Sequence, residues 1–305
     1  MNFSKRTAEN DVEILTIENK YIKTEIAPGL GGKILSVYNK NLNKEFLWTN
    51  VDLELKPNNP GENYESNFKG GIDELIPNDM SEVVDSNNYP DHGELWTTPL
   101  QYTVTREKVS LFGSFKISKL SYQKNIFLAD NGPIIHMEYR IKNCSHYKQF
   151  LMWKLHAALA IEEGDKLVTS AKKAKVVIPN YSRFGDINEF NWPIIDKIDA
   201  SKIAPISNII DFFYLFDNEE SKMGLLSSNG EHEFMFKYDK NIFPYQCSFA
   251  SYGGFRGHYT TILEPSTCMP NSVNEARRIG QCTSLEPDQE ISTSLQIYAG
   301  KKINN

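Results

Sequence analysis

The sequence predicts an all-β protein, a large antiparallel β-sandwich with long loops and few short helices. Apolar and polar residues alternate with a period of two through much of the chain, and Gly, Pro and Asn clusters recur between the alternating segments. Helical signals are scarce. At 305 residues and 40% hydrophobic composition, the chain is long enough to bury a core of its own.

The strand prediction rests on four segments. In "PIIHMEYRIKN" (133–143), Ile135, Met137 and Tyr139 alternate with polar residues, which is typical of a half-buried strand. The segments "YIKTEIAP", "SFKISKLSY" and "EISTSLQIYAG" alternate in the same way. Turn signals such as "APGLGG" and "ADNGP" separate them and favour antiparallel connections.

One helix is expected in "NSVNEARRIG" (271–280). Ser272 and Glu275 have the spacing of a capping box, and Gly280 stands where a helix of one or two turns would end. No long linker, low-complexity tract or fixed repeat interrupts the chain, so we expect residues 1–305 to form a single domain. A tandem of two smaller sandwiches is the alternative.

Charge and composition narrow the class of partner. A net charge of −6 argues against nucleic acid, whose recognition needs clustered Lys and Arg. No apolar run approaches 18 residues and the N-terminus lacks a signal-peptide core, so we expect a cytoplasmic protein without a membrane partner. The four cysteines show no CxxC spacing, which favours reduced thiols. The sequence leaves open whether two copies of the chain form a homodimer.

The loop "NNYPDHGELWTTP" (87–99) is the first place to look for chemistry. It sets His92 between two carboxylates, and histidine is the side chain whose pKa suits proton transfer near neutrality. Trp96, four residues later, adds an aromatic side chain to the same loop.

Two strand-like segments carry further candidates. In "FLMWKLHAALAIEEGD" (150–165), alternation places Lys154 and His156 on one face among small or apolar residues, as in a partly polar pocket; a hydrogen-bonded core histidine is the alternative. In "GHYTTILEPSTCMPNSVNEA" (257–276), Glu264 precedes Pro265, which should end the strand and leave the carboxylate at a cleft rim. We expect structural roles for His136, His146, His232 and His258 and do not count them as site candidates.

Several motifs are missing. The chain has no HxH or HExxH metal pair, no GxSxG elbow, no GxGxxG and no GxxxxGK[ST]. We therefore expect no metal and no cofactor. One carboxylate and two histidines on a β scaffold would be sufficient for acid–base chemistry on a neutral ligand.

Taken together, five blocks resemble the aldose 1-epimerase family, the galactose mutarotase-like proteins. They are "PGLGGKILSV", "FKGGIDELIP", "YPDHGELW", "LHAALAI" and "ILEPSTCMPNSVNEA", and they occur in the family's order from about residue 26 to 299. The resemblance implies a β supersandwich with a carbohydrate-binding cleft, an isomerase activity that interconverts the α and β anomers of an aldose, and a small sugar as partner.

The resemblance also implies roles for particular residues. Glu264 matches the family's catalytic glutamate, His156 its general acid, and His92 a histidine that contacts the sugar. Lys69, ahead of Gly70 and Gly71, stands where the phosphosugar branch has a basic residue.

The chain departs from the family in two places. The phosphosugar branch has an arginine shortly after the loop histidine, whereas this chain has Glu94, Leu95 and Trp96. Glu94 would repel a phosphate and Trp96 offers a stacking face for a pyranose, which favours an unphosphorylated sugar. The family's sugar-binding arginine has Lys33 as its nearest counterpart, and lysine cannot form the same bidentate contact. The family's binding aspartate could be Asp186, Asp196 or Asp211.

Three other functions remain open. A non-catalytic carbohydrate-binding protein could use the same cleft. A phosphosugar mutarotase would need a basic cluster at the rim, with Lys69, Lys154 and Arg256 as candidates. A glycosidase would pair Asp91 or Glu94 with Glu264.

Overall fold

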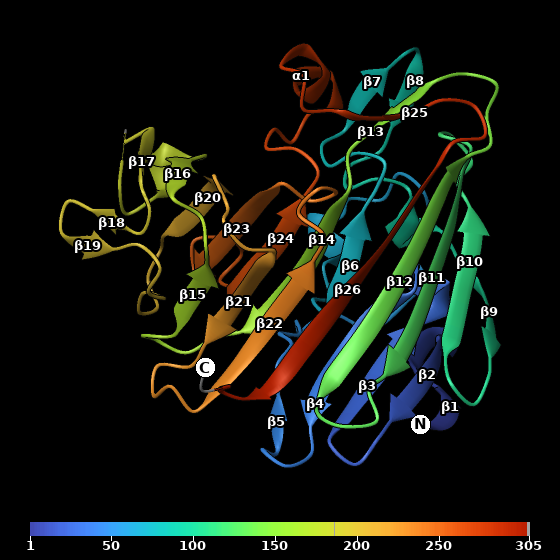
Figure 1. Ribbon diagram of the computed structural model, residues 1–305, viewed down its shortest axis with the longest axis horizontal. Helices are drawn as coiled ribbons and strands as arrows, with labels where there is room; N and C mark the ends of the chain where they lie inside the picture. Colours follow the sequence, from blue (N-terminus) through green and yellow to red (C-terminus); the bar gives the residue numbers. More distant parts are fainter. Residues whose placement is uncertain (186, 304–305) are drawn as a thin grey trace.

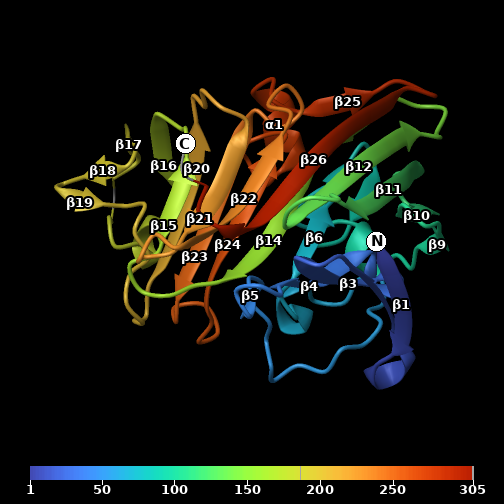
Figure 2. The ribbon, with the colours of Figure 1, turned by 60° about the horizontal axis from the view of Figure 1, so that its bottom comes forward.

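Two large antiparallel sheets pack face to face in the computed structural model, which describes residues 1–185 and 187–303 (Figure 1). Seen after a 60° turn, the two layers run side by side along most of the molecule (Figure 2). This is the all-β sandwich that the alternation predicts. In the part of the chain that the structure describes, no helix is long and apolar enough to cross a membrane.

The larger sheet has twelve strands within the described residues. In spatial order they are β1 (Asn2–Thr7), β2 (Glu13–Glu18), β3 (Ile22–Ala27), β4 (Lys33–Asn39), β6 (Ile72–Leu75), β14 (Lys154–Ala160), β24 (Tyr259–Ser266), β23 (Tyr245–Tyr252), β20 (Ile210–Phe216), β16 (Lys173–Val176) and β17 (Glu189–Asn191), with β5 (Lys44–Glu45) paired to β4. Its central strands come from distant parts of the chain.

The smaller sheet has eight strands in the same residues. In spatial order they are β15 (Lys166–Thr169), β21 (Lys222–Leu226), β22 (His232–Tyr238), β26 (Glu290–Lys301), β12 (Ile134–Asn143), β11 (Leu120–Leu128), β10 (Val109–Ser114) and β9 (Gln101–Val104). Its long strands follow the predicted alternation. On β12, Ile135, Met137 and Tyr139 are buried, while Glu138 and Arg140 face solvent.

Short elements decorate the sandwich. They are the strand pairs β7 (Glu82–Val84) with β8 (Asn87–Tyr89), β13 (Gln149–Leu151) with β25 (Thr283–Leu285) and β18 (Ile194–Ile195) with β19 (Ile198–Asp199), the helix α1 (Val273–Arg278), and the 3₁₀ turns η1 (Glu9–Asp11), η2 (Pro28–Leu30), η3 (Glu65–Asn67), η4 (Leu95–Thr97) and η5 (Pro179–Tyr181). The first two pairs and α1 gather at one end of the sandwich, at the top of Figure 1.

The Ser272 half of the predicted capping box is confirmed, whereas the Glu275 carboxylate binds Arg278 instead. The Ser272 hydroxyl accepts a hydrogen bond from the backbone N–H of Glu275 at 3.1 Å, and Gly280 has a positive φ of 73° just past the last turn. The cap satisfies one of the free N–H groups that begin every helix.

Three strand limits differ from the expectation. Residues 115–119 of the predicted strand "SFKISKLSY" form a turn, because the Glu94 carboxylate accepts the backbone N–H groups of Ile117 and Ser118. The segment 150–165 splits into β13 and β14, since the Trp153 N–H donates to the Thr267 hydroxyl. Pro265 does not end β24, which continues to Ser266 and stays paired with β23.

Strand β14 lies in the middle of the larger sheet and is buried on both faces. Leu155, Ala157 and Leu159 belong to the main core between the sheets. Lys154 and His156 point to the other face and are buried as well. A strand that is buried on both faces, yet carries two basic side chains on one of them, marks the place where a polar cluster is enclosed.

Candidate active site

A row of polar side chains crosses the centre of the larger sheet, on the face opposite the main core. On β14, His156 pairs in register with Asp73 of β6. Beyond the next strand, Cys247 of β23 pairs with Tyr214 of β20 in the same row. Side chains at paired positions project from the same face, so these residues come together through pairing alone.

Glu264 of β24 completes the row beside His156. The two strands are antiparallel and pair Ala157 with Leu263. One position further along the pair, His156 on β14 stands opposite Glu264 on β24. Pairing resumes in the same register at Lys154. Residues directly opposite on neighbouring strands have Cβ atoms about 4.5–5.5 Å apart. The sheet therefore brings His156 and Glu264 to one place.

The His156 ring is held through one nitrogen. Its Nδ1 lies 2.9 Å from Asp73 Oδ1 and 3.3 Å from the Tyr64 hydroxyl. An ionised Asp73 only accepts hydrogen bonds, so Nδ1 carries the hydrogen of this contact. Among the described residues Nε2 has no hydrogen-bond partner, and the ring lines a cavity.

Asp73 is kept ionised by its surroundings. Burial alone would raise the pKa of this carboxyl, but the Lys33 ammonium, 2.9 Å from Oδ2, and His156 hold it well below its usual range. The Tyr64 hydroxyl also donates to Oδ2, at 3.0 Å. Both carboxylate oxygens are thus occupied, which fixes the plane of the His156 ring.

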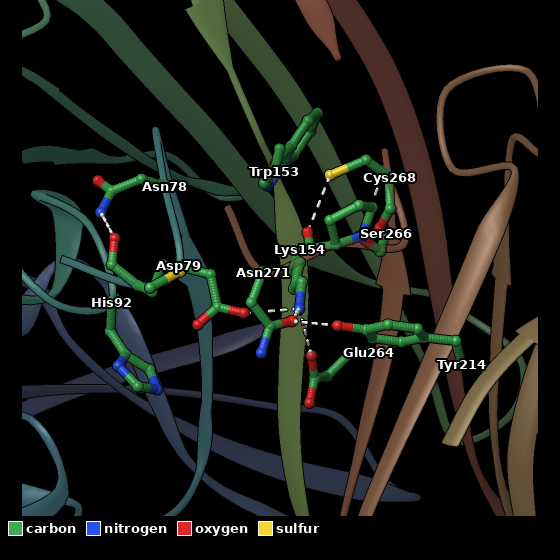
Figure 3. Close-up of polar contacts among 12 residues, drawn as sticks. Asn78, Asp79, His92, Trp153, Lys154, Tyr214, Glu264, Ser266, Cys268 and Asn271 are labelled. Carbon is green, nitrogen blue, oxygen red and sulfur yellow. Dashed lines mark hydrogen bonds and ion pairs between the residues drawn. The ribbon is translucent and has the colours of Figure 1, made fainter. Parts of the chain in front are cut away.

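On the other side of the row, Lys154 holds Glu264. The buried ammonium lies 3.3 Å from Glu264 Oε2, 2.6 Å from Asp79 Oδ2 and 2.9 Å from Asn271 Oδ1 (Figure 3). An ammonium has three hydrogens, and three oxygens surround this one. Glu264 Oε1 makes no hydrogen bond within the residues that the structure describes.

Lys154 and Asp79 keep each other charged. Burial disfavours the charged form of the lysine, yet the charge of Asp79 raises the pKa of Lys154 well above its usual value. Burial likewise raises the pKa of Asp79, but Lys154, followed by His92, lowers it overall. Lys154 therefore stays a cation next to Glu264, with Asp79 as its counter-ion.

His92 reaches the same cavity from the loop after β8. Its ring stacks on Tyr64 with centroids 3.8 Å apart, and its Nδ1 lies 3.0 Å from Asp91 Oδ1. Burial would lower the pKa of His92, but Asp91 and Asp79 raise it. The φ of His92 is 59°, and a side chain on the following Gly93 would meet the Ile76 carbonyl oxygen at 2.3 Å. This close approach requires glycine there.

These groups border a cavity of about 190 Å³. Its volume is below the roughly 300–1,000 Å³ of drug-sized ligand sites, which suits one small ring. One end is polar, with Asp79, His92, His156, Glu264 and Asn271. The remainder of the wall is largely aromatic and aliphatic, and it consists of Tyr64, Phe68, Leu75, Phe212, Phe249, Phe255 and Ile262, with Glu65, His258 and Thr260 between them.

Two of the predicted site residues do not border this cavity. The Lys69 ammonium donates to the carbonyl oxygens of Asn50 and Leu53 and lies at two other surface hollows. Trp96 is buried, packs edge-on against Tyr64 at 5.2 Å between centroids and donates its indole N–H to the Asp91 carbonyl. Trp96 therefore supports Tyr64, and its indole face is not free for a sugar.

The other carboxylates weighed from the sequence have different positions. Glu94 is engaged by the backbone of the 115–119 turn. Asp211 is fully buried and accepts from Arg183 Nε and the Ser182 hydroxyl, away from the cavity wall. Asp196 lies on the β18–β19 turn with a positive φ, and Asp186 lies outside the described residues.

The sequence reasoning missed four residues that hydrogen-bond to His156 or Lys154, and it set aside His258, which borders the cavity. Asp73, Tyr64, Asp79 and Asn271 all contact His156, Lys154 or the cavity. Asp73 and Asp79 stand in or beside the recognised block "FKGGIDELIP", and a carboxylate flanking such a block was the available signal. Within residues 1–185 and 187–303, no group of three or more His, Cys, Asp or Glu side chains is arranged to hold a metal ion.

Comparison with solved structures identifies the fold. The chain matches a "putative aldose 1-epimerase" from Klebsiella pneumoniae over 98% of its length and 83% of that chain, with a TM-score of 0.74 and 13% identity. A galactose mutarotase-like protein from Clostridium acetobutylicum matches over 98% of both chains, with a TM-score of 0.73 and 14% identity. A TPR-domain containing protein from Parabacteroides distasonis gives a TM-score of 0.70 and 11% identity over 96% of this chain and 48% of that one.

Sequence comparison adds less. A family model described as a domain of unknown function, DUF5107, matches residues 1–74. Comparison with curated proteins finds no match. The structural matches extend over nearly the whole chain, and at 11–14% identity they establish architecture. The chain has the β-sandwich fold of the galactose mutarotase-like proteins.

Proposed function

We propose that the protein is an aldose 1-epimerase that interconverts the α and β anomers of a free aldose. The observation that supports this most directly is the placement of His156 and Glu264 at opposite positions on β14 and β24, at one cavity. Each has one polar atom without a partner among the described residues, His156 Nε2 and Glu264 Oε1. Mutarotation needs two such groups.

The reaction would proceed by two proton transfers. Glu264 Oε1 takes the proton of the anomeric hydroxyl, the C1 carbonyl forms, and the bond between C1 and the ring oxygen breaks. The protonated His156 gives its Nε2 proton to that oxygen. After rotation about the C1–C2 bond, the hydroxyl attacks the other face of the carbonyl and both protons return. Each transfer contributes about 10²- to 10⁴-fold.

The neighbouring charges suit these roles. The ionised Asp73 holds Nδ1 at 2.9 Å and leaves Nε2 as the nitrogen that can give a proton. The Lys154 ammonium lies 3.3 Å from Oε2 and leaves Oε1 as the oxygen that can take a proton. His92, whose pKa is raised by Asp91 and Asp79 against the effect of burial, would donate to a sugar hydroxyl.

The charge of the cavity favours an unphosphorylated sugar. Asp79, Glu264 and Glu65 all border it, and a phosphate would be repelled by these carboxylates. The basic candidates already have partners: Lys69 contacts backbone carbonyls, and Arg256 lies 3.6 Å from Glu65 at the cavity border. Lys154 is enclosed by Asp79, Asn271 and Glu264.

Polarimetry tests the proposal. Freshly dissolved α-D-glucose and α-D-galactose should reach anomeric equilibrium faster with the protein than in buffer. Glucose 6-phosphate, followed by NMR of its anomeric protons, should be accelerated least. Rates equal to buffer for a panel of free aldoses, together with sugar binding, would instead favour a carbohydrate-binding protein on the same fold.

A further inference from the structure

The side chain of Asn271 is anchored in a way that the proposed acid–base pair does not explain. Asn271 lies between the end of β24 and Ser272, the residue that caps α1. Its backbone carbonyl accepts the N–H of Met80 at 3.2 Å, from the loop that carries Asp79. The backbone of Asn271 is thus tied to the helix cap and to the polar end of the cavity.

Both acceptor sites of the Asn271 carboxamide are in use. Its Oδ1 accepts from the Lys154 ammonium at 2.9 Å and from the Tyr214 hydroxyl at 3.1 Å. A carboxamide oxygen has two lone pairs, and these two donors fill them. Exchanging the oxygen and nitrogen would press an NH₂ group against an ammonium, so the hydrogen-bond network determines the orientation.

The amide nitrogen is left free on the cavity side. Asn271 borders the cavity and is half-buried, and Nδ2 has no hydrogen-bond acceptor among the described residues. Figure 3 shows the nitrogen turned away from Lys154. Because Oδ1 of Asn271 and Oε2 of Glu264 both contact the same Lys154 nitrogen, they lie within about 6 Å of each other. A ligand that reaches Glu264 is therefore within reach of Nδ2.

We infer that Asn271 is a substrate-binding residue whose Nδ2 donates a hydrogen bond to a ring hydroxyl of the sugar. The inference rests on the proposed function and adds a specificity element to it. The carboxylates that border the cavity accept hydrogen bonds, and Asn271 supplies a neutral donor among them. Since Lys154 and Tyr214 fix the amide before the sugar enters, no side-chain rotation has to be frozen on binding.

The test combines variants with deoxy sugars. Mutarotation of D-glucose, D-galactose and their 2-, 3-, 4- and 6-deoxy analogues is measured for the wild type and for Asn271→Ala. Loss of one neutral hydrogen bond should raise KM roughly 2- to 10-fold and leave kcat nearly unchanged. For the one deoxy analogue that lacks the bonded hydroxyl, the variant and the wild type should have equal kcat/KM.

Two further variants serve as controls. Asn274→Ala removes a carboxamide on α1 that bonds Glu82 and the Val83 carbonyl outside the cavity, and it should leave KM unchanged. Asn271→Ser keeps an oxygen for Lys154 but has no amide, so it should reproduce the KM increase even if Asn271→Ala lowers the melting temperature.

The outcomes separate the two proposals. If the wild type accelerates mutarotation but Asn271→Ala and Asn271→Ser lose nothing, or lose the same factor on every deoxy analogue, the role of Asn271 is refuted while the epimerase activity remains. If no sugar of the panel is turned over and none binds by isothermal titration calorimetry, both proposals are refuted.

Discussion

Asp73 and Glu74 are neighbours on β6, and they build two different kinds of buried charge cluster. Glu74 points between the sheets and is fully buried. Its Oε1 accepts from Lys124 at 2.8 Å and from the Tyr139 hydroxyl at 2.6 Å, and its Oε2 accepts from the Tyr122 hydroxyl at 3.2 Å. Every polar atom of that carboxylate has a partner, and none faces a cavity.

Asp73 points to the opposite face and belongs to a cluster that is incomplete. It holds His156 by one nitrogen and leaves the other free, and across the row Lys154 holds one oxygen of Glu264 and leaves the other free. The two faces use similar pairs, a lysine with a carboxylate at 2.8 Å between the sheets and at 2.6 Å in the site. A cluster whose polar atoms are all satisfied supports the fold, whereas unused donors and acceptors can act on a ligand.

The largest effect is expected from removing the base. Glu264→Gln should lower kcat about 10²- to 10⁴-fold, because the amide cannot take the anomeric proton. His156→Asn should have an effect of similar size for the acid step. Polarimetry with thermal unfolding checks both. Glu290→Gln, a surface change beside Arg140, should match the wild type; a base variant with wild-type kcat would contradict the mechanism.

Substitutions in the Lys124–Glu74 cluster between the sheets should lower the free energy of unfolding rather than the activity. Lys124→Met leaves the Glu74 carboxylate buried without its cation, which should cost about 3–5 kcal/mol of unfolding free energy. The double variant Lys124→Met/Glu74→Gln removes the unpaired charge and should recover part of that loss. Urea unfolding measures this, and kcat per folded molecule should stay near wild type. A loss of kcat without a loss of stability would contradict the assignment of a purely structural role to this cluster.

An intermediate effect is expected where Asp73 orients the acid. Asp73→Asn should lower kcat about 10- to 100-fold, since small misplacements of a reacting group are costly. The ¹⁵N shifts of His156 should show a changed tautomer balance, which a purely structural role for Asp73 would not produce. Unaltered ring shifts together with unaltered kcat would show that Asp73 does not position the histidine.

The smallest effect concerns His92 and pH. Its folded-state pKa is raised by Asp91 and Asp79 despite burial, so its protonated form stabilises the fold. That contribution is fully present below the unfolded value near 6.5 and is lost as pH rises through the folded value. The stability difference between the wild type and His92→Gln should therefore be larger at pH 5.5 than at pH 8.5. The opposite trend in urea unfolding would show that His92 is neutral when folded.

Local patterns in the sequence were sufficient for most of the architecture. Alternation on β12 and β26 and the cap at Ser272 depend on neighbours in the chain, and these predictions are confirmed. The expected strand at 114–122 was wrong because a distant residue, Glu94, binds its backbone. Pattern reasoning has no access to such a contact.

The candidate site residues also fall into two groups, those that the fold brings to the cavity and those that packing places elsewhere. The residue types at His92, His156 and Glu264 and the resemblance of their blocks to a known family were readable from the chain, and the fold brings these three to one cavity. Trp96 and Lys69 were equally readable as types, yet packing buries the indole under Tyr64 and directs the ammonium to backbone carbonyls.

The β character, the helix cap and the identity of the groups that could exchange protons can be predicted from the chain, because they depend on side-chain chemistry and on spacing between neighbouring residues. The contacts of Asp73 with His156 and of Lys154 with Glu264, and the place of Asn271 at the cavity, arise only in the folded protein. The reason is that β6, β14 and β24 are far apart in the chain, with Asp73 83 positions from His156 and Glu264 further still, and only their register determines which side chains meet.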